Sequence, residues 1–62
     1  MTLKNMRKEL GLSLRQVARA TGINHNTVHR AENDSVDVGH RKVRALQSFY
    51  EAELANREDN HG

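Results

Sequence analysis

Residues 13–33 contain two short amphipathic segments that meet at Gly22, and this arrangement restricts the chain to a small set of folds. Ser13 and Gln16 have the spacing of a capping box, in which the two side chains bind free N–H groups at the start of a helix. Gly22 suits the position just past a helix end, where a positive φ costs glycine little. Asn24 can then cap a second helix. The segment therefore predicts two short helices joined by a tight turn.

The second of these helices, predicted over 25–33, has two different faces. Val28 and Ala31 recur three residues apart, so they share the face that turns inward. The outer face carries four hydrogen-bonding side chains, none of them acidic: His25, Asn26, His29 and Arg30. Such a face is suited to bind another polar surface.

Apolar spacing predicts two further helices. One covers 3–10, where Thr2 can cap the start and three apolar residues share one face, namely Leu3, Met6 and Leu10. The last covers about 39–57, with an apolar stripe made of Val43, Leu46, Phe49 and Tyr50. Between residues 33 and 39 we expect a turn from which Val36 and Val38 fill the core. The fold class is therefore all-α.

Size and composition limit what this chain can be. Its 62 residues allow one domain, 1–62, with a small core that association or binding often supplements. It has no cysteine, no apolar run long enough to span a membrane and no signal-peptide pattern. We therefore expect a soluble cytoplasmic protein, nucleoid-associated in a bacterial or phage-infected cell, without disulfides.

Charge is distributed unevenly along the chain. The net charge is +2, but residues 1–44 carry +5 and residues 45–62 carry −3. A basic body with an acidic tail is compatible with a polyanionic partner on one side, although ordinary surface charge for solubility is the simpler interpretation.

Four short motifs occur in the order and at the spacing that a known family shows. They are Leu10-Gly11-Leu12-Ser13, Gln16-Val17-Ala18, Gly22-Ile23-Asn24, and Thr27-Val28 followed by Arg30, Glu32 and Asn33. With them the chain resembles the Cro and lambda-type repressors, the XRE-type helix-turn-helix proteins, over about residues 3–50. The resemblance implies a compact lambda-repressor-like domain of four helices with a long C-terminal helix. It also implies binding to double-stranded DNA, with the helix over 25–33 in the major groove and no cofactor.

In that setting the outer face of the second helix becomes a candidate for reading bases. Arg30 can donate two hydrogen bonds to guanine, and Asn26 can pair with adenine. His25 and His29 are further base readers. Outside the motif, Arg30 would be taken as a solvated surface residue. The two histidines also have the spacing of a zinc-binding helix, but no third ligand is evident and no metal site is expected.

Contacts to the DNA backbone are expected from the flanks of this helix. The candidates are Asn24, Arg15, Arg19, Asn33, Ser35, His40, Arg41 and Lys42. Members of the family often have a glutamine where this chain has Leu14, so that phosphate contact must come from Arg15 or from backbone N–H groups.

The resemblance further implies a structural ion pair between Arg7 and Glu32. It also implies pairing of two copies on a palindromic operator, as a homodimer that forms in solution or only on DNA. The last helix is the best candidate for the dimer surface. Tyr50 and Leu54 are expected mainly in this interface, while Phe49 is a third candidate that, like Leu46, can instead complete the monomer core.

The leading hypothesis is a small transcriptional regulator, a Cro-like repressor that acts by occupying an operator, with its minimal size typical of phage members. One alternative is an antitoxin-type DNA-binding protein, which a long extension after Ala55 would favour. Another is an architectural or recombination-directing DNA-binding protein, which a more basic surface would favour. An enzyme is not expected, because the sequence has no nucleophile–base pair, paired carboxylates or phosphate loop.

Overall fold

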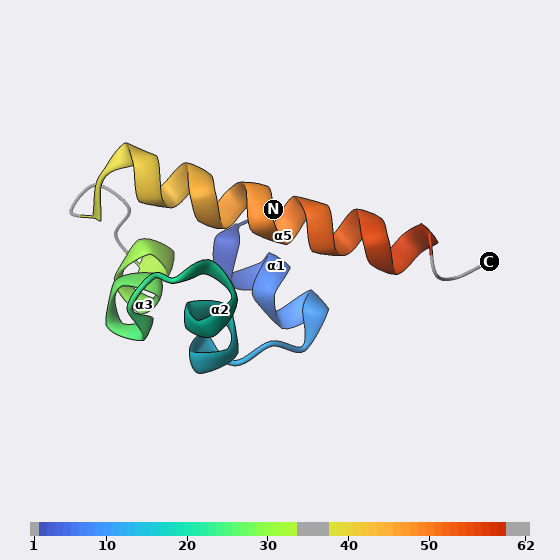
Figure 1. The fold of residues 1–62 in the computed structure, drawn as a ribbon, viewed down its shortest axis with the longest axis horizontal. Helices are drawn as coiled ribbons and strands as arrows, with labels where there is room; N and C mark the ends of the chain where they lie inside the picture. The colour runs from blue at the N-terminus through green and yellow to red at the C-terminus, as the bar shows by residue number, and fades with distance from the viewer. Residues whose placement is uncertain (1, 34–37, 60–62) are drawn as a thin grey trace.

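The chain folds into three short helices packed against one long helix (Figure 1). The computed structural model describes residues 2–33 and 38–59, and in them the helices are α1 (Leu3–Leu10), α2 (Leu14–Thr21), α3 (His25–Asn33) and α5 (His40–Asp59). These bounds follow the predicted ranges, and the long helix extends two residues beyond its expected end. No strand occurs in the described residues. The prediction of an all-α fold with a long C-terminal helix is confirmed.

Side-chain caps begin α1 and α2 where the sequence predicts. The hydroxyl of Thr2 accepts a hydrogen bond from the N–H of Asn5 at 3.1 Å. Ser13 and Gln16 form the complete capping box, with the N–H of Gln16 donating to the Ser13 hydroxyl at 3.1 Å and the N–H of Ser13 donating to the Gln16 side chain at 2.7 Å. Because these caps satisfy N–H groups that lack a partner within the helix, they define where each short helix begins.

The turn between α2 and α3 depends on a left-handed glycine. Gly22 has φ +75°, and its N–H donates to the carbonyl of Ala18 at 2.8 Å. Thr21 adds a side-chain contact that the sequence analysis did not anticipate. Its hydroxyl donates to the carbonyl of Val17 at 2.8 Å and accepts from the N–H of Ile23 at 3.3 Å. These bonds turn the chain within three residues and direct α3 away from α2.

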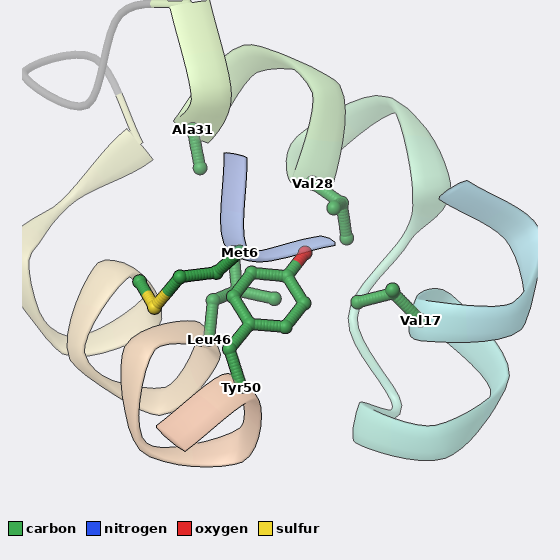
Figure 2. Close-up of a cluster of buried hydrophobic side chains, with 6 residues drawn as sticks. All are labelled: Met6, Val17, Val28, Ala31, Leu46 and Tyr50. Atoms are coloured by element: carbon green, nitrogen blue, oxygen red, sulfur yellow. The ribbon is translucent and has the colours of Figure 1, made fainter. Parts of the chain in front are cut away.

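All four helices contribute to one hydrophobic core, whose buried members are Met6, Val17, Val28, Ala31, Leu46 and Tyr50 (Figure 2). Val17 of α2 and Val28 of α3 are fully buried, as is Leu46 of α5. Each such side chain stabilises the fold by roughly 1.5–3 kcal/mol through removal from water. Val38 packs partly buried against this cluster, as expected, whereas Val36 lies outside the described residues.

The long helix α5 runs along one side of the three shorter helices and packs most extensively on α1 (Figure 1). Near its end, the guanidinium of Arg57 donates to the main-chain carbonyl of Glu9. That carbonyl belongs to the last turn of α1, where carbonyls have no partner within the helix. In the described residues, no helix combines the length and apolar character that a membrane span requires.

Tyr50 corrects the predicted dimer surface. It was expected mainly in an interface, but it is fully buried in the monomer core (Figure 2). Its hydroxyl lies 3.5 Å from a carboxylate oxygen of Glu32. Burial, together with the nearby carboxylate, raises the pKa of Tyr50 to about 12. A side chain with no exposed surface cannot contact a second copy, so the prediction for Tyr50 is wrong.

The other two interface candidates are also engaged within the monomer. Leu54 was expected beyond the reach of the three short helices, yet it is partly buried and packs against the core. Phe49 is likewise partly buried, and its ring lies against Tyr50 with the ring centroids 5.6 Å apart. The short helices therefore cover more of α5 than its sequence pattern indicates.

Replacing Tyr50 by phenylalanine tests the environment of the hydroxyl. The folded pKa of about 12 exceeds the ordinary value of 10.0, so the stability linked to the neutral hydroxyl is complete below pH 10 and is lost as the pH rises toward 12. Between about pH 10 and 12, the unfolding free energy of the wild type should fall more steeply than that of Tyr50→Phe, by up to about 1.4 kcal/mol per pH unit. Urea denaturation across this range measures both slopes, with lysine titration common to the two proteins. If the unfolding free energies of the two proteins fell in parallel with pH, the raised pKa of Tyr50 would be contradicted.

Candidate nucleic-acid interface

Helix α3 separates a buried face from an exposed polar face. Val28 is fully buried and Ala31 is 4% exposed, whereas Asn26, His29 and Arg30 are exposed. His25, expected on the same outer face, is half-buried at the start of the helix. The structure therefore brings three of the four candidate base readers to solvent on one helix.

Asn24 begins α3 in the manner predicted from sequence. Its side-chain oxygen accepts a hydrogen bond from the N–H of Asn26 at 2.8 Å, and its main-chain carbonyl accepts from the N–H of Val28 at 3.0 Å. The side-chain amide of Asn24 remains exposed at the end of the helix from which DNA-reading helices contact bases.

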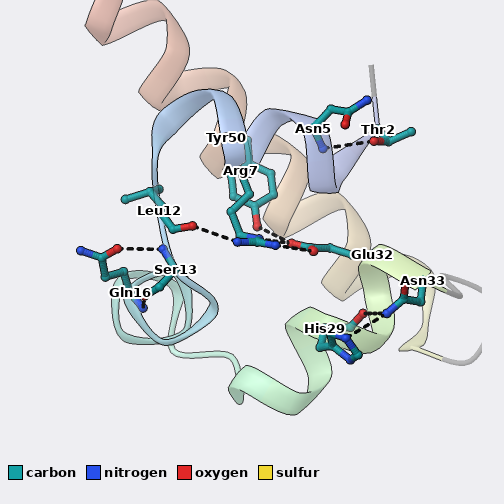
Figure 3. Close-up of polar contacts among 10 residues, drawn as sticks. All are labelled: Thr2, Asn5, Arg7, Leu12, Ser13, Gln16, His29, Glu32, Asn33 and Tyr50. Atoms are coloured by element: carbon teal, nitrogen blue, oxygen red, sulfur yellow. Dashed lines mark hydrogen bonds and ion pairs between the residues drawn. The ribbon is translucent and has the colours of Figure 1, made fainter.

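The other end of α3 is held by the ion pair that the sequence predicts (Figure 3). Arg7 of α1 donates from Nε to Glu32 at 2.6 Å and from Nη2 to the second carboxylate oxygen at 3.1 Å. The side chains of Arg7 and Glu32 are 14% and 2% exposed, so the pair is largely shielded from water. The Glu32 hydrogen bond raises the pKa of Arg7 above its ordinary value, against the opposing effect of burial.

Two further contacts extend this pair to the rest of the molecule. The third guanidinium nitrogen of Arg7 donates to the carbonyl of Leu12 at 2.9 Å, in the segment between α1 and α2. The hydroxyl of Tyr50 in α5 donates to the same Glu32 oxygen that Nε of Arg7 binds, at 3.5 Å (Figure 3). Neither contact was anticipated, because sequence spacing does not reveal which distant groups meet a buried carboxylate.

His29 and Asn33 interact on the exposed surface of α3. The side-chain nitrogen of Asn33 donates to the main-chain carbonyl of His29 at 3.0 Å and lies 3.2 Å from Nε2 of its ring. Asn33 was expected at a phosphate, but here its amide protons face His29. The four-residue spacing, which places side chains together on a helix, was the available sequence signal for this pair.

Most of the predicted backbone-contacting residues lie on the surface, namely Arg15, Arg19, His40, Arg41 and Lys42. Ser35 lies outside the described residues. Figure 1 shows α3 and the beginning of α5 at the same end of the molecule, and the two helices are in contact. The basic start of α5 therefore lies at the end of the molecule that carries α3.

Leu14, which replaces a common polar residue of the motif, is partly buried against the core. It serves packing, so the exposed side chain next to it, Arg15, is the one at the start of α2 that can reach a phosphate. Within the part of the chain that the structure describes, no three His, Asp or Glu side chains gather closely enough to hold a metal ion.

The helix pair α2–α3, its glycine turn and its exposed second helix define a helix-turn-helix fold. Comparison with protein families agrees: the sequence model described as "Helix-turn-helix domain" matches residues 1–59. This chain therefore belongs to the helix-turn-helix domain family. Helix-turn-helix domains bind DNA in transcription regulation, so membership indicates DNA binding. Searches of curated proteins and of solved structures found no match.

Substitutions at the Arg7–Glu32 pair test its structural role. Removing one partner leaves a buried charge without compensation, so Arg7→Met or Glu32→Leu should each lower the unfolding free energy by about 3–5 kcal/mol. The double variant removes both charges and should lose clearly less than the two single losses combined. Chemical denaturation measures all three variants.

Arg15→Met is the matched control, because it removes an exposed arginine and should change stability by less than about 0.5 kcal/mol. Single variants at Arg7 and Glu32 that are no less stable than this control would contradict the proposed role of the pair.

Proposed function

We propose that this chain is a small sequence-specific repressor of the Cro type, which blocks transcription by occupying an operator. The observation that carries this proposal is the exposed polar face of α3, opposite a fully buried Val28. A helix held from behind by the core presents its outer side chains in a fixed register. This register is what direct readout of base edges requires.

Each exposed side chain of this face has a chemistry that suits a base edge. Arg30 can donate two hydrogen bonds to guanine O6 and N7, and Asn26 can pair with adenine N6 and N7. His29 can contact a base with its ring. His25, half-buried at the start of the helix, has less surface to offer and takes a secondary place in the readout.

Phosphate contacts would orient the domain on the duplex without reading sequence. The exposed residues suited to this role are Arg15 and Arg19 of α2, Asn24 before α3, and His40, Arg41 and Lys42 of α5. Asn33 is a weaker candidate than its sequence position indicated, because its amide donates within α3.

Pairing of two copies on a palindromic operator follows from the size of one reading face, which covers about half of such a site. The buried Tyr50 and the partly buried Leu54 serve the monomer's own core, as Phe49 also does in part. We therefore place pairing on the DNA, where adjacent half-sites hold two copies side by side.

The specificity of binding is tested at Arg30. A bidentate contact to guanine contributes about 1–3 kcal/mol of discrimination, so Arg30→Ala should weaken binding to a selected operator about 5- to 150-fold while changing binding to random DNA far less. The operator would first be obtained by selecting bound sequences from a random duplex pool. Titration of labelled DNA then measures both affinities.

Lys4→Ala is the control, since Lys4 is an exposed cation that belongs to α1 and not to the reading helix. It should leave the ratio of specific to random binding unchanged. Loss of all wild-type binding under random competitor would instead indicate an architectural DNA-binding protein, and equal losses on both DNAs for Arg30→Ala would contradict its role as a base reader.

Pairing is tested by the spacing of half-sites. Two recognition helices on one face of DNA require half-site centres about one helical turn apart, or about 34–36 Å. The free chain should sediment as a monomer at micromolar concentration, and two copies should bind a full operator. Inserting about five base pairs between the half-sites places them on opposite faces and should abolish any cooperativity. Unchanged cooperativity would contradict pairing on DNA.

A further inference from the structure

The side-chain nitrogen of Asn33 lies close to both the main-chain carbonyl and the ring of His29 (Figure 3). The main-chain carbonyl of His29 can only accept a hydrogen bond, so the Asn33 atom 3.0 Å from it is the amide nitrogen. The same nitrogen lies 3.2 Å from Nε2 of the ring. Its second proton is therefore available to Nε2.

An amide proton directed at Nε2 requires a lone pair on that atom. In a neutral imidazole one nitrogen accepts and the other donates, so Nδ1 of His29 then carries the ring proton. His29 is exposed, and no described residue accepts a hydrogen bond from this N–H. Among the residues that the structure describes, this N–H is therefore left to solvent or to a bound molecule.

We propose that Asn33 is a positioning residue that makes His29 a hydrogen-bond donor, and thereby a reader of acceptor groups in the major groove. This inference rests on the proposed function. The acceptors there are guanine O6 and N7, adenine N7 and thymine O4, whereas the amino groups of adenine and cytosine are donors. A ring with its proton at Nδ1 donates to these acceptor atoms, and it finds no acceptor in the amino group of cytosine.

Helix capping alone does not account for this geometry. The hydrogen bond from Asn33 to the main-chain carbonyl of His29 holds the end of the Asn33 side chain on α3, and it requires only one amide proton. The approach of the same amide to the ring is additional, and it acts on a side chain that lies next to Arg30 on the exposed face.

The protonation of His29 can be measured directly in the free protein. Nitrogen-15 spectra of the imidazole, recorded at about pH 8, distinguish the two neutral tautomers. Wild-type His29 should be mainly the Nδ1–H form. Asn33→Ala should shift it toward Nε2–H, and Asn33→Asp should shift it further, because a carboxylate accepts where the amide donates.

Asn56→Ala, at an exposed asparagine of α5, is the matched control and should leave the His29 tautomer unchanged. Asn33→Ala and Asn33→Asp are both assessed for helical content first, and either one that folds suffices for the comparison. A wild-type ring that is mainly Nε2–H, or a tautomer unaffected in the folded Asn33 variant, would overturn the proposal.

The consequence for recognition is measured on DNA. His29→Ala identifies the base position that His29 reads in the selected operator, and the wild type should prefer guanine or thymine there over cytosine. Asn33→Ala should reduce this preference about three- to tenfold, whereas loss of a phosphate contact would leave the preference unchanged. A merely structural role would weaken binding to all sequences alike, and that result would overturn the proposal.

Failure of the proposed function would give a different result. The wild-type chain would then show no base preference, while Asn33 would still control the tautomer of His29.

Discussion

The buried pair of Arg7 and Glu32 is the interaction on which the arrangement of this domain depends. Glu32 lies at the end of the recognition helix α3, and the guanidinium that binds it also binds the carbonyl of Leu12, just before α2. Tyr50 brings α5 to the same carboxylate. The two charged groups of this pair thus connect α1, the segment before α2, the end of α3 and α5. An uncompensated buried charge is costly, so conformations of the domain in which α3 moves away from α1 are strongly disfavoured.

This anchoring matters because the helices are too short to be stable alone. Isolated helices of eight or nine residues are marginal in water, and most of their stability in proteins comes from packing of an apolar face. Val17 and Val28 supply that packing between α2 and α3. The outer face of α3 is then left to polar side chains that contribute little to the fold. A rigid inner face and a chemically variable outer face allow a single scaffold to recognise different DNA sequences.

The long helix α5 has a structural role along most of its length. Its aromatic and leucine residues complete the core over α1, and Arg57 adds a contact to the last turn of that helix. The exposed basic residues near its beginning lie beside α3, while the chain beyond residue 44 is net acidic. Charge is therefore positive where the candidate nucleic-acid interface lies and negative toward the C-terminus, which favours one orientation on a polyanion.

The sequence by itself determined the local elements, and only the tertiary structure decided which long-range contacts they make. Caps at Thr2, Ser13 and Asn24, the turn at Gly22, and the inward side of α3 could all be predicted, because each follows from interactions among residues a few positions apart. The ion pair could be predicted only through a family resemblance. The burial of Tyr50 and Leu54 could not be predicted, because periodicity shows that a helix has an apolar face but does not show how far neighbouring helices cover it. The contact of Asn33 with His29 also required coordinates, since its effect depends on which atom of the amide faces which atom of the ring.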